Sequence, residues 1–353
     1  MGYNLDYTQT AVLLAAYEQM EKPTTFLQSR YFPVGTTFGT DEVLVEYKEG
    51  TKKLAPFVAP EVGGKVVKRQ GYTAKAYQPA FIAPKRTLTI DVLKKKGFGE
   101  AYYNQLSPEE RALAITAKDL VDMDDMIVRR EEAMCAEVLQ TNALTMKHYT
   151  DDNVLYATKN IAYYDGVSNP AVYTPAKSWG TADADVIGDC AAMALSLKHR
   201  SLPATDVILG TEAADAFLND EKLQKLLDNR NYNIGVIDPT EQFEDAVLLA
   251  QINCKGHKLN FIQYTGTYED ENGIIKDYIN SKDIIVTAPG CGVINYGAIT
   301  QIDYGSADFN TYVGKRVPLY EVEKQVKSVA LRAAPLVQPV NKDPFIKATV
   351  IFS

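Results

Sequence analysis

The sequence predicts an α+β protein, and three observations support that prediction. A helical pattern spans residues 107–142 without an interior glycine or proline, a segment with strand-like alternation precedes it, and a compact block of mixed helices and strands follows it. Hydrophobic residues make up 46% of the chain and charged residues 23%, which is typical of a folded globular protein. At 353 residues the chain is long enough for two or three compact units.

The N-terminal part is predicted to form an arm followed by an open β-segment. Residues 8–21 have the apolar spacing of a short helix, which Pro23 ends. Residues 41–95 alternate like strands, but their many prolines and glycines favour an extended excursion over a packed domain. Within 51–96, eleven basic residues stand against two acidic ones, so this segment carries +9 and the rest of the chain carries −17.

Residues 107–142 give the clearest helical signal. Ser107 is a typical N-cap, Pro108 suits the first helical position, and Glu110 completes a capping box. A helix of this length would run ~50 Å, which is longer than one small domain is wide, so we expect a spine across which other elements lie. Nine acidic residues against four basic ones give this segment a net charge of −5.

A compact α/β block is predicted from residue 181 onward. The tail from Arg316 to Phe352 alternates, and we expect it to form strands that return to an earlier sheet. The expected elements of the block are a helix capped by Thr181 or Asp183, a buried strand at 206–210, a helix from Thr211 that breaks near Asn219, a hairpin over 259–279 with its turn at 269–273, and a strand at 284–286.

The sequence contains no recognisable catalytic, cofactor-binding or metal-binding pattern. It lacks the P-loop, HExxH, GxSxG and EF-hand signatures. The four cysteines lie far apart without a CxxC pair, so we expect small buried hydrophobes. A Cys–His dyad would have to combine Cys254 or Cys291 with His148 or His257, and core cysteines with surface histidines are the simpler explanation. We therefore predict a protein that is not an enzyme and that needs no cofactor.

We expect neither a secretion signal nor a membrane-spanning segment. Asp6 and Glu18 stand where a signal peptide avoids charge, and no apolar run approaches the ~18 residues that a membrane helix needs. The net charge of −8 fits a protein that encloses nucleic acid better than one that grips it, because binding to phosphates needs a concentrated basic surface.

Five segments in chain order carry a resemblance to one known family. They are YTQTAVLLAAYEQ with PTTFLQSRYFP, FVAPEVGGKVVKRQGYTAKAYQPAFIAPKRTL, SPEERALAITAKDLVDMDDMIVRREEAMCAEVLQTNAL, QYTGTYEDENGIIKDYINSKDIIV, and APLVQPVNKDPFIKATV. Together they resemble the major capsid proteins of lambda-like tailed bacteriophages, the phage capsid E family. The order holds over nearly the whole chain, so the resemblance is specific although each segment alone is a weak signal.

The resemblance implies the Hong Kong 97-type capsid fold and divides the chain into five parts. These are an N-terminal arm at 1–40, an extended loop at 41–96, a peripheral domain at 97–180 with the spine helix at 107–142, an axial domain at 181–300, and return strands of the peripheral domain at 301–353.

The resemblance also implies a function and partners. Copies of the chain would form the hexamers and pentamers of an icosahedral procapsid in the host cytoplasm, around a separate scaffold protein and with a portal protein. The shell would then expand around packaged double-stranded DNA, and in this family a decoration protein often binds outside. An encapsulin-like compartment shell with the same fold is the alternative, and a cytosolic hydrolase is disfavoured because no nucleophile with a base is apparent.

The charge split suggests which residues make contacts between subunits. In the resembled fold, the loop of one subunit lies over the peripheral domain of the next. We expect Lys65, Lys68, Arg69 and Lys75 of the loop to face Asp122, Asp124 and Asp125 of a neighbour's spine helix, steering the loop into place. The competing explanation is that the basic residues only keep an exposed β-segment soluble.

Overall fold

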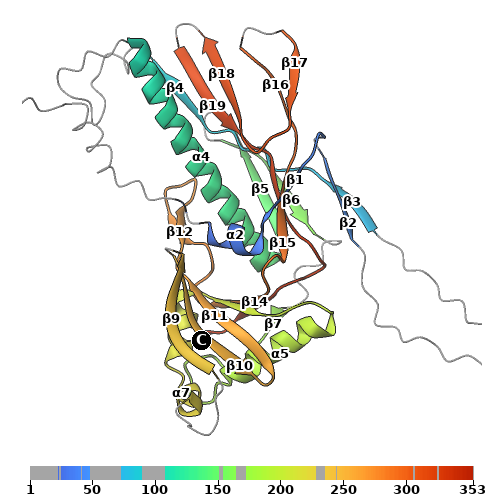
Figure 1. Cartoon of the computed structure of the whole chain (residues 1–353), viewed down its shortest axis with the longest axis vertical. Helices are drawn as coiled ribbons and strands as arrows, with labels where there is room; N and C mark the ends of the chain where they lie inside the picture. Colours follow the sequence, from blue (N-terminus) through green and yellow to red (C-terminus); the bar gives the residue numbers. More distant parts are fainter. Residues whose placement is uncertain are drawn as a thin grey trace, which may run out of the picture.

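The computed structural model has an upper body built along one long helix and a lower body built on a seven-stranded sheet (Figure 1). The predicted helix at 8–21 and much of the extended segment lie outside the part of the chain that the structure describes. The described residues are 23, 25–40, 42–47, 73–89, 108–150, 154–163, 172–227, 235–243, 245–304, 307–323 and 326–352.

Helix α4, Pro108–Thr141, confirms the predicted spine. It runs from the far end of the upper body down to the junction with the lower body (Figure 1). Met123 and Ile127 are fully buried in a cluster with Val329 and Leu331, so the middle of the helix packs on the neighbouring antiparallel sheet. The strands of that sheet are β18 Val317–Glu323, β19 Val326–Arg332 and β4 Lys85–Leu88.

Smaller groups of strands complete the upper body and the junction. One three-stranded sheet joins distant parts of the chain, because Val34 in its first strand pairs with Ile294 in its second. Its strands are β1 Val34–Thr37, β15 Gly292–Tyr296 and β20 Pro335–Pro339. Four two-stranded ribbons follow: β2 Val43–Tyr47 with β3 Thr73–Tyr77, β5 Ala143–Tyr149 with β6 Leu155–Ala162, β12 Thr267–Glu269 with β13 Ile275–Asp277, and β16 Ile299–Ile302 with β17 Phe309–Tyr312.

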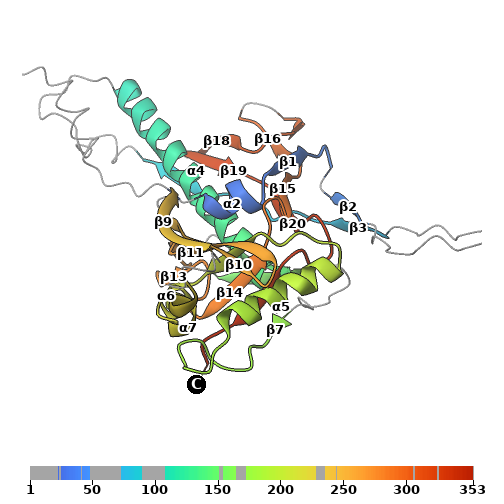
Figure 2. The same cartoon turned by 60° about the horizontal axis from the view of Figure 1, so that its bottom comes forward.

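The lower body is a mixed sheet with helices on one side (Figure 2). Its strands, in spatial order, are β7 Val172–Tyr173, β21 Ile346–Thr349, β14 Asp283–Thr287, β8 Asp206–Leu209, β11 His257–Tyr264, β10 Ala246–Cys254 and β9 Gly235–Phe243. The helices are α5 Val186–His199, α6 Thr211–Leu218 and α7 Glu221–Leu227.

Both faces of this sheet are buried, which explains the continuous apolar runs of its central strands. Val207 and Leu209 of β8 face the cluster that contains α5 and α6. Ile208, which points the opposite way because strand side chains alternate, belongs to a second cluster with α2 Phe26–Tyr31 and the C-terminal half of α4. The sheet is therefore the layer that connects the two bodies.

The predicted elements of the α/β block are largely confirmed, with three corrections. The N-cap of α5 is Asp185, whose side chain accepts a hydrogen bond from the Gly188 N–H. The predicted caps, Thr181 and Asp183, do not cap this helix. The hairpin around 269–273 is shorter than expected because the chain leaves the sheet after Tyr264 and pairs again only at β12 and β13. The tail does not return to one sheet, since β19 and β20 join the upper body whereas β21 pairs with β14 below.

The continuity of α4 can be tested with Met123→Pro. Proline removes one helical hydrogen bond and clashes with the preceding turn, at a cost of ~3 kcal/mol or more, and Met123 lies in the buried middle of the helix. We expect a large loss of helical circular dichroism and of soluble yield, whereas Met123→Leu, which keeps the volume, should behave as the parent. Equal melting temperatures for the two variants would contradict a single continuous helix.

Candidate functional site: the spine helix

Acidic side chains along helix α4 bind segments from both ends of the chain. Three positions carry these contacts: Arg86 near the far end, Arg316 in the middle, and the α2 segment close to the junction. Because the helix presents successive residues about 100° apart, carboxylates on its different faces reach different segments.

Near the far end of α4, one arginine of β4 bridges two carboxylates. Arg86 Nη1 lies 2.6 Å from Asp119 Oδ1 and 2.8 Å from Asp122 Oδ2, and these two residues share a helix face because they are three positions apart. Their hydrogen bonds raise the pKa of the Arg86 guanidinium. The arginine side chain is 42% exposed, so each pair contributes at most about 1 kcal/mol.

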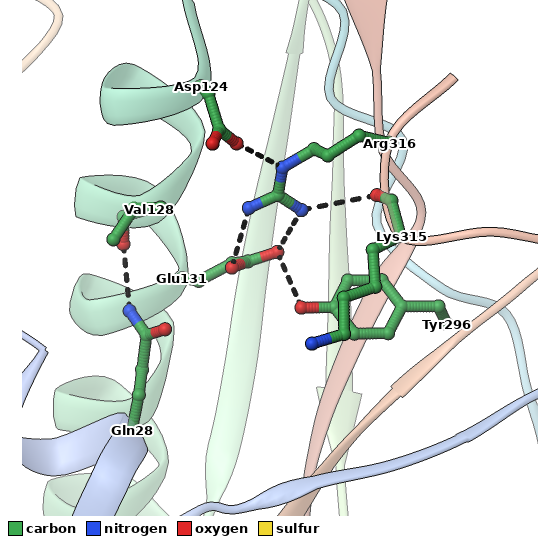
Figure 3. A network of polar contacts seen from close by, with 7 residues as sticks. All are labelled: Gln28, Asp124, Val128, Glu131, Tyr296, Lys315 and Arg316. Carbon is green, nitrogen blue, oxygen red and sulfur yellow. Dashed lines mark hydrogen bonds and ion pairs between the residues drawn. The ribbon is translucent and has the colours of Figure 1, made fainter. Parts of the chain in front are cut away.

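In the middle of α4, Arg316 enters a network of polar groups, of which Glu131 and Tyr296 are buried (Figure 3). Its guanidinium binds both carboxylate oxygens of Glu131, at 2.9 and 3.1 Å, and its Nε donates to Asp124 at 2.5 Å. The Tyr296 hydroxyl donates to Glu131 at 3.1 Å. Burial lowers the pKa of Arg316, but the bonds and charge of Glu131 and Asp124 outweigh it and hold the pKa above its ordinary range.

This network fastens the C-terminal part of the chain to the spine. Arg316 directly precedes β18, and Glu131 is only 2% exposed, so the ion pair has little water to compete with it. Burial together with Glu131 also raises the pKa of the Tyr296 phenol, which stays protonated and keeps its donor role at neutral pH. The geometry is that of a structural clamp between a helix and a strand.

The C-terminal half of α4 is held to the β12–β13 ribbon, to the segment before β14 and to β5. Arg130 Nη2 lies 2.5 Å from Glu271 in the β12–β13 turn, and the Gln140 amide donates to the Tyr278 carbonyl oxygen at 2.9 Å. The Thr145 N–H donates to Glu137, whose pKa burial raises. The spine helix therefore contacts both bodies along its length.

The structure brings only some of the predicted contact residues to the spine. Asp122 and Asp124 bind Arg86 and Arg316 of their own chain, and Asp125 is partly buried on the same helix. Lys75 lies on β3, on the side of the upper body away from α4 in both views (Figures 1 and 2). The remaining three, Lys65, Lys68 and Arg69, fall outside the described residues.

Sequence reasoning missed the residues that hold the spine in place. In the sequence, Arg86 is one of eleven basic residues in its segment and Arg316 is the start of the tail. Nothing local links Arg316 to a carboxylate 185 positions away, or Arg86 to carboxylates more than 30 positions away. The one available signal was Glu131, an acidic residue among apolar neighbours in the buried stripe of the helix. Such a residue needs a cation or several donors.

The thiols and histidines do not form a catalytic pair. Cys254 lies opposite His257 across the β10–β11 turn, but burial raises the pKa of the Cys254 thiol to about 12, and the pKa of Cys291 likewise. Neither thiol is ionised at neutral pH, and a thiolate is what nucleophilic catalysis needs. All four cysteines are free and buried, as predicted.

Within the described part of the chain, no cluster of three or more His, Cys, Asp or Glu side chains has the geometry to hold a metal ion. Among the same residues, no helix is long and apolar enough to cross a membrane.

The Arg316 clamp predicts a large stability effect. Arg316→Ala leaves Glu131 buried without its cation, which should lower the free energy of unfolding by about 3–5 kcal/mol. Arg86→Ala is the matched control, since it also removes an arginine from two carboxylates but at an exposed position, and it should cost about 1 kcal/mol. Urea unfolding of the purified chain measures both, and equal losses would contradict the clamp.

Comparisons with known proteins agree with this architecture. Residues 9–350 match the family model described as phage major capsid protein E. The major capsid protein of Enterobacteria phage P21 is 24% identical over 303 residues, covering 82% of this chain and 83% of the relative. The major capsid protein of Escherichia phage lambda is 22% identical over 348 residues, covering 96% and 97%.

A solved structure shares the fold over almost the whole chain. The crystal structure of a prophage capsid protein from E. coli CFT073 superposes with a TM-score of 0.63 at 15% identity, covering 98% of this chain and 99% of that one. The family match extends over nearly every residue, and the α+β arrangement of spine helix and sheets agrees with it. The chain therefore belongs to the phage major capsid protein E family and has the α+β fold of a phage capsid subunit.

Proposed function

We propose that this chain builds the icosahedral head of a tailed phage, first as a procapsid and then as an expanded shell around double-stranded DNA. The family match over residues 9–350 carries this proposal. The upper body supports it, because an elongated body clamped along one helix is suited to contacts with several neighbouring copies. Assembly takes place in the host cytoplasm around a scaffold protein, with a portal protein at one vertex and a decoration protein outside.

We also propose that the five-part division of the chain describes its working units. The arm at 1–40, the loop at 41–96 and the spine-based peripheral domain at 97–180 would contact neighbours, and the axial domain at 181–300 would point to the centre of each hexamer or pentamer. The return strands at 301–353 would serve both bodies, since β21 lies in the sheet of the lower body.

Assembly is tested by expressing the full chain alone and together with a scaffold protein. We expect rings or closed shells in negative-stain electron microscopy, because apolar side chains such as Phe309 and Tyr156 stand 76% and 81% exposed on the single subunit. A sharply monomeric sedimentation profile at high concentration in both preparations would contradict the proposal. Closed shells that form without scaffold and take up only a tagged cargo protein would favour the encapsulin-like alternative.

We propose that the protein does no catalysis. The raised thiol pKa values of Cys254 and Cys291 support this, and so does the fact that Glu131 is fully engaged in the Arg316 clamp. Strongly shifted pKa values occur in active sites and also in structural ion-pair networks. In this chain the side chains that shift one another's pKa values most strongly hold segments of the fold together.

We further propose that the basic loop is steered onto the acidic spine helix of a neighbour. Lys65, Lys68 and Arg69 supply the positive charge. Asp122, Asp124 and Asp125 of the spine helix, all at least partly exposed, supply the negative charge. Asp122 and Asp124 also bind arginines of their own chain, and their charge still adds to the negative field.

The steering proposal predicts a salt-dependent assembly rate. Reversing Lys65, Lys68 and Arg69 to Glu should slow assembly, measured by light scattering, and should flatten its dependence on salt, because charges in water are screened within ~8 Å at physiological ionic strength. Asp125→Lys in the reversed chain should restore part of the rate. Lys85→Glu is a control from the same basic segment, since Lys85 pairs with Glu321 of its own chain. A reversed chain with the parental rate and salt dependence would refute steering.

A further inference from the structure

Helix α2 is the first described helix, and it sits where the two bodies meet (Figures 1 and 2). Phe26, Leu27 and Tyr31 are fully buried in the cluster that also contains the end of α4 and the inner face of the lower sheet. The ring of Phe26 packs against Tyr264 of β11, with centroids 5.3 Å apart. The segment is therefore packed against the spine and the lower sheet at once.

The start of α2 is capped by a residue of another helix. Thr25 stands at the N-cap, but its side chain makes no capping bond. Instead the Leu27 and Gln28 N–H groups donate to the two oxygens of Glu132 on α4, at 2.7 and 3.1 Å. These N–H groups lie in the first turn, where no helical acceptor exists, so Glu132 supplies what an N-cap side chain normally would.

The other end of α2 is held by a second carboxylate, from the lower body. Asp206 of β8 is fully buried and accepts from Arg30 Nε at 2.7 Å, from the Tyr31 hydroxyl at 3.2 Å and from Asn260 Nδ2 at 2.9 Å. Asp206 thus has a cation, whereas the contacts of Glu132 within the described chain are N–H and O–H donors without an ion pair. The carboxylate at the C-terminal end of α2 is therefore paired with a cation, and the carboxylate at its N-terminal end is bound by neutral donors.

At this junction, Glu132 is consequently the buried carboxyl group that has hydrogen-bond donors but no cation to balance its charge. Burial raises the pKa of Glu132 to about 7, against the opposing effect of its bonds to Leu27, Gln28 and Tyr264. Around it, burial also raises the pKa values of Cys135 on α4 and Tyr278 before β14, so both are neutral at pH 7.

The other charged side chains on the elements that pack around Glu132 bind or act on groups other than Glu132. Glu131 on α4 binds Arg316, and Arg30 on α2 binds Asp206. Arg129, whose carbonyl oxygen accepts from the Tyr278 hydroxyl, contributes a charge that acts on Tyr278. Glu132 is thus the carboxyl in contact with α2 that changes its charge near neutral pH.

We propose that Glu132 and α2 form a proton-coupled latch, in which the N-terminal segment docks most tightly when Glu132 carries a proton and loosens as the carboxylate ionises. Release of α2 uncovers Glu132 to water. A carboxyl that is buried when docked and wet when released binds its proton more tightly in the docked state, so acid favours docking. The latch concerns the subunit itself and does not depend on the proposed steering of the loop.

The direction of the pH effect and its range follow from the pKa of Glu132, which is the ordinary 4.5 when α2 is released and about 7 when α2 is docked. Docking strength is fully present below the ordinary pKa of 4.5, falls as the pH rises towards about 7, and is constant above it. Protonation of the oxygen that faces Gln28 loses only the longer of the two backbone bonds. The ratio of released to docked α2 should therefore increase on the order of 50-fold between pH 5 and pH 8.

Hydrogen exchange of the purified full-length chain measures this ratio. Peptides covering residues 25–33 are followed from pH 5 to pH 8, corrected for intrinsic exchange, with the buried strand β14 as an internal reference. We expect protection of 25–33 to fall through pH 5–7 and then level off, while β14 stays constant. Glu132→Gln should remove the dependence on pH.

Two further variants separate the latch from a general loss of packing. Tyr264→Phe removes a donor that lowers the pKa of Glu132, so the levelling-off should move to higher pH even if Glu132→Gln folds poorly. Glu137→Gln is the matched control on the same helix, because Glu137 accepts from Thr145 and should leave the response of 25–33 unchanged. Protection of 25–33 that is independent of pH in the parent, or a parental slope in Glu132→Gln, would overturn the proposal.

Discussion

Two adjacent buried carboxylates on helix α4, Glu131 and Glu132, are the constraint on which the rest of the structure depends. They are 2% and 0% exposed. Taking an ion out of water costs several kcal/mol, so each must find partners. Because neighbouring positions on a helix point about 100° apart, the two reach in different directions. Glu131 finds Arg316 from the C-terminal part, and Glu132 finds the backbone of Leu27 and Gln28 from the N-terminal part.

The spine therefore organises the subunit by polar contacts as much as by apolar packing. Its apolar contact in the middle is small, with Met123 and Ile127 against one strand of a three-stranded sheet. Arg86, Arg316 and α2 then fix three segments at successive heights along the helix. Hydrogen-bonded charges fix geometry more narrowly than apolar packing does, which suits a subunit whose shape has to match that of its neighbours.

For a member of the phage major capsid protein E family, this arrangement divides the charges into two groups. Arg86 and Arg316 neutralise acidic residues within the chain, so those charges serve the fold. Lys65, Lys68 and Arg69 belong to the second group, which we propose serves contacts with other copies. Apolar side chains on β16 and β17, such as Ile302 and Phe309, are exposed on the single subunit, and we propose that a neighbouring copy covers them.

Much of the fold could be predicted from the sequence because its signals are local. Ser107-Pro108 and the uninterrupted apolar spacing determined α4, alternation and the Asn272-Gly273 turn located the hairpin, and the order of motifs identified the family. The wide spacing of the cysteines likewise predicted that they are small buried side chains, and all four are free and buried.

Only the tertiary structure decided which carboxylates face which cations. Glu131 and Arg316 are 185 residues apart, and Glu132 caps a helix more than 100 residues earlier in the chain. It also decided that β21 joins the lower sheet. Such choices depend on how separate segments meet when both faces of a sheet and one face of a long helix are buried together, and no spacing within a single segment contains that information.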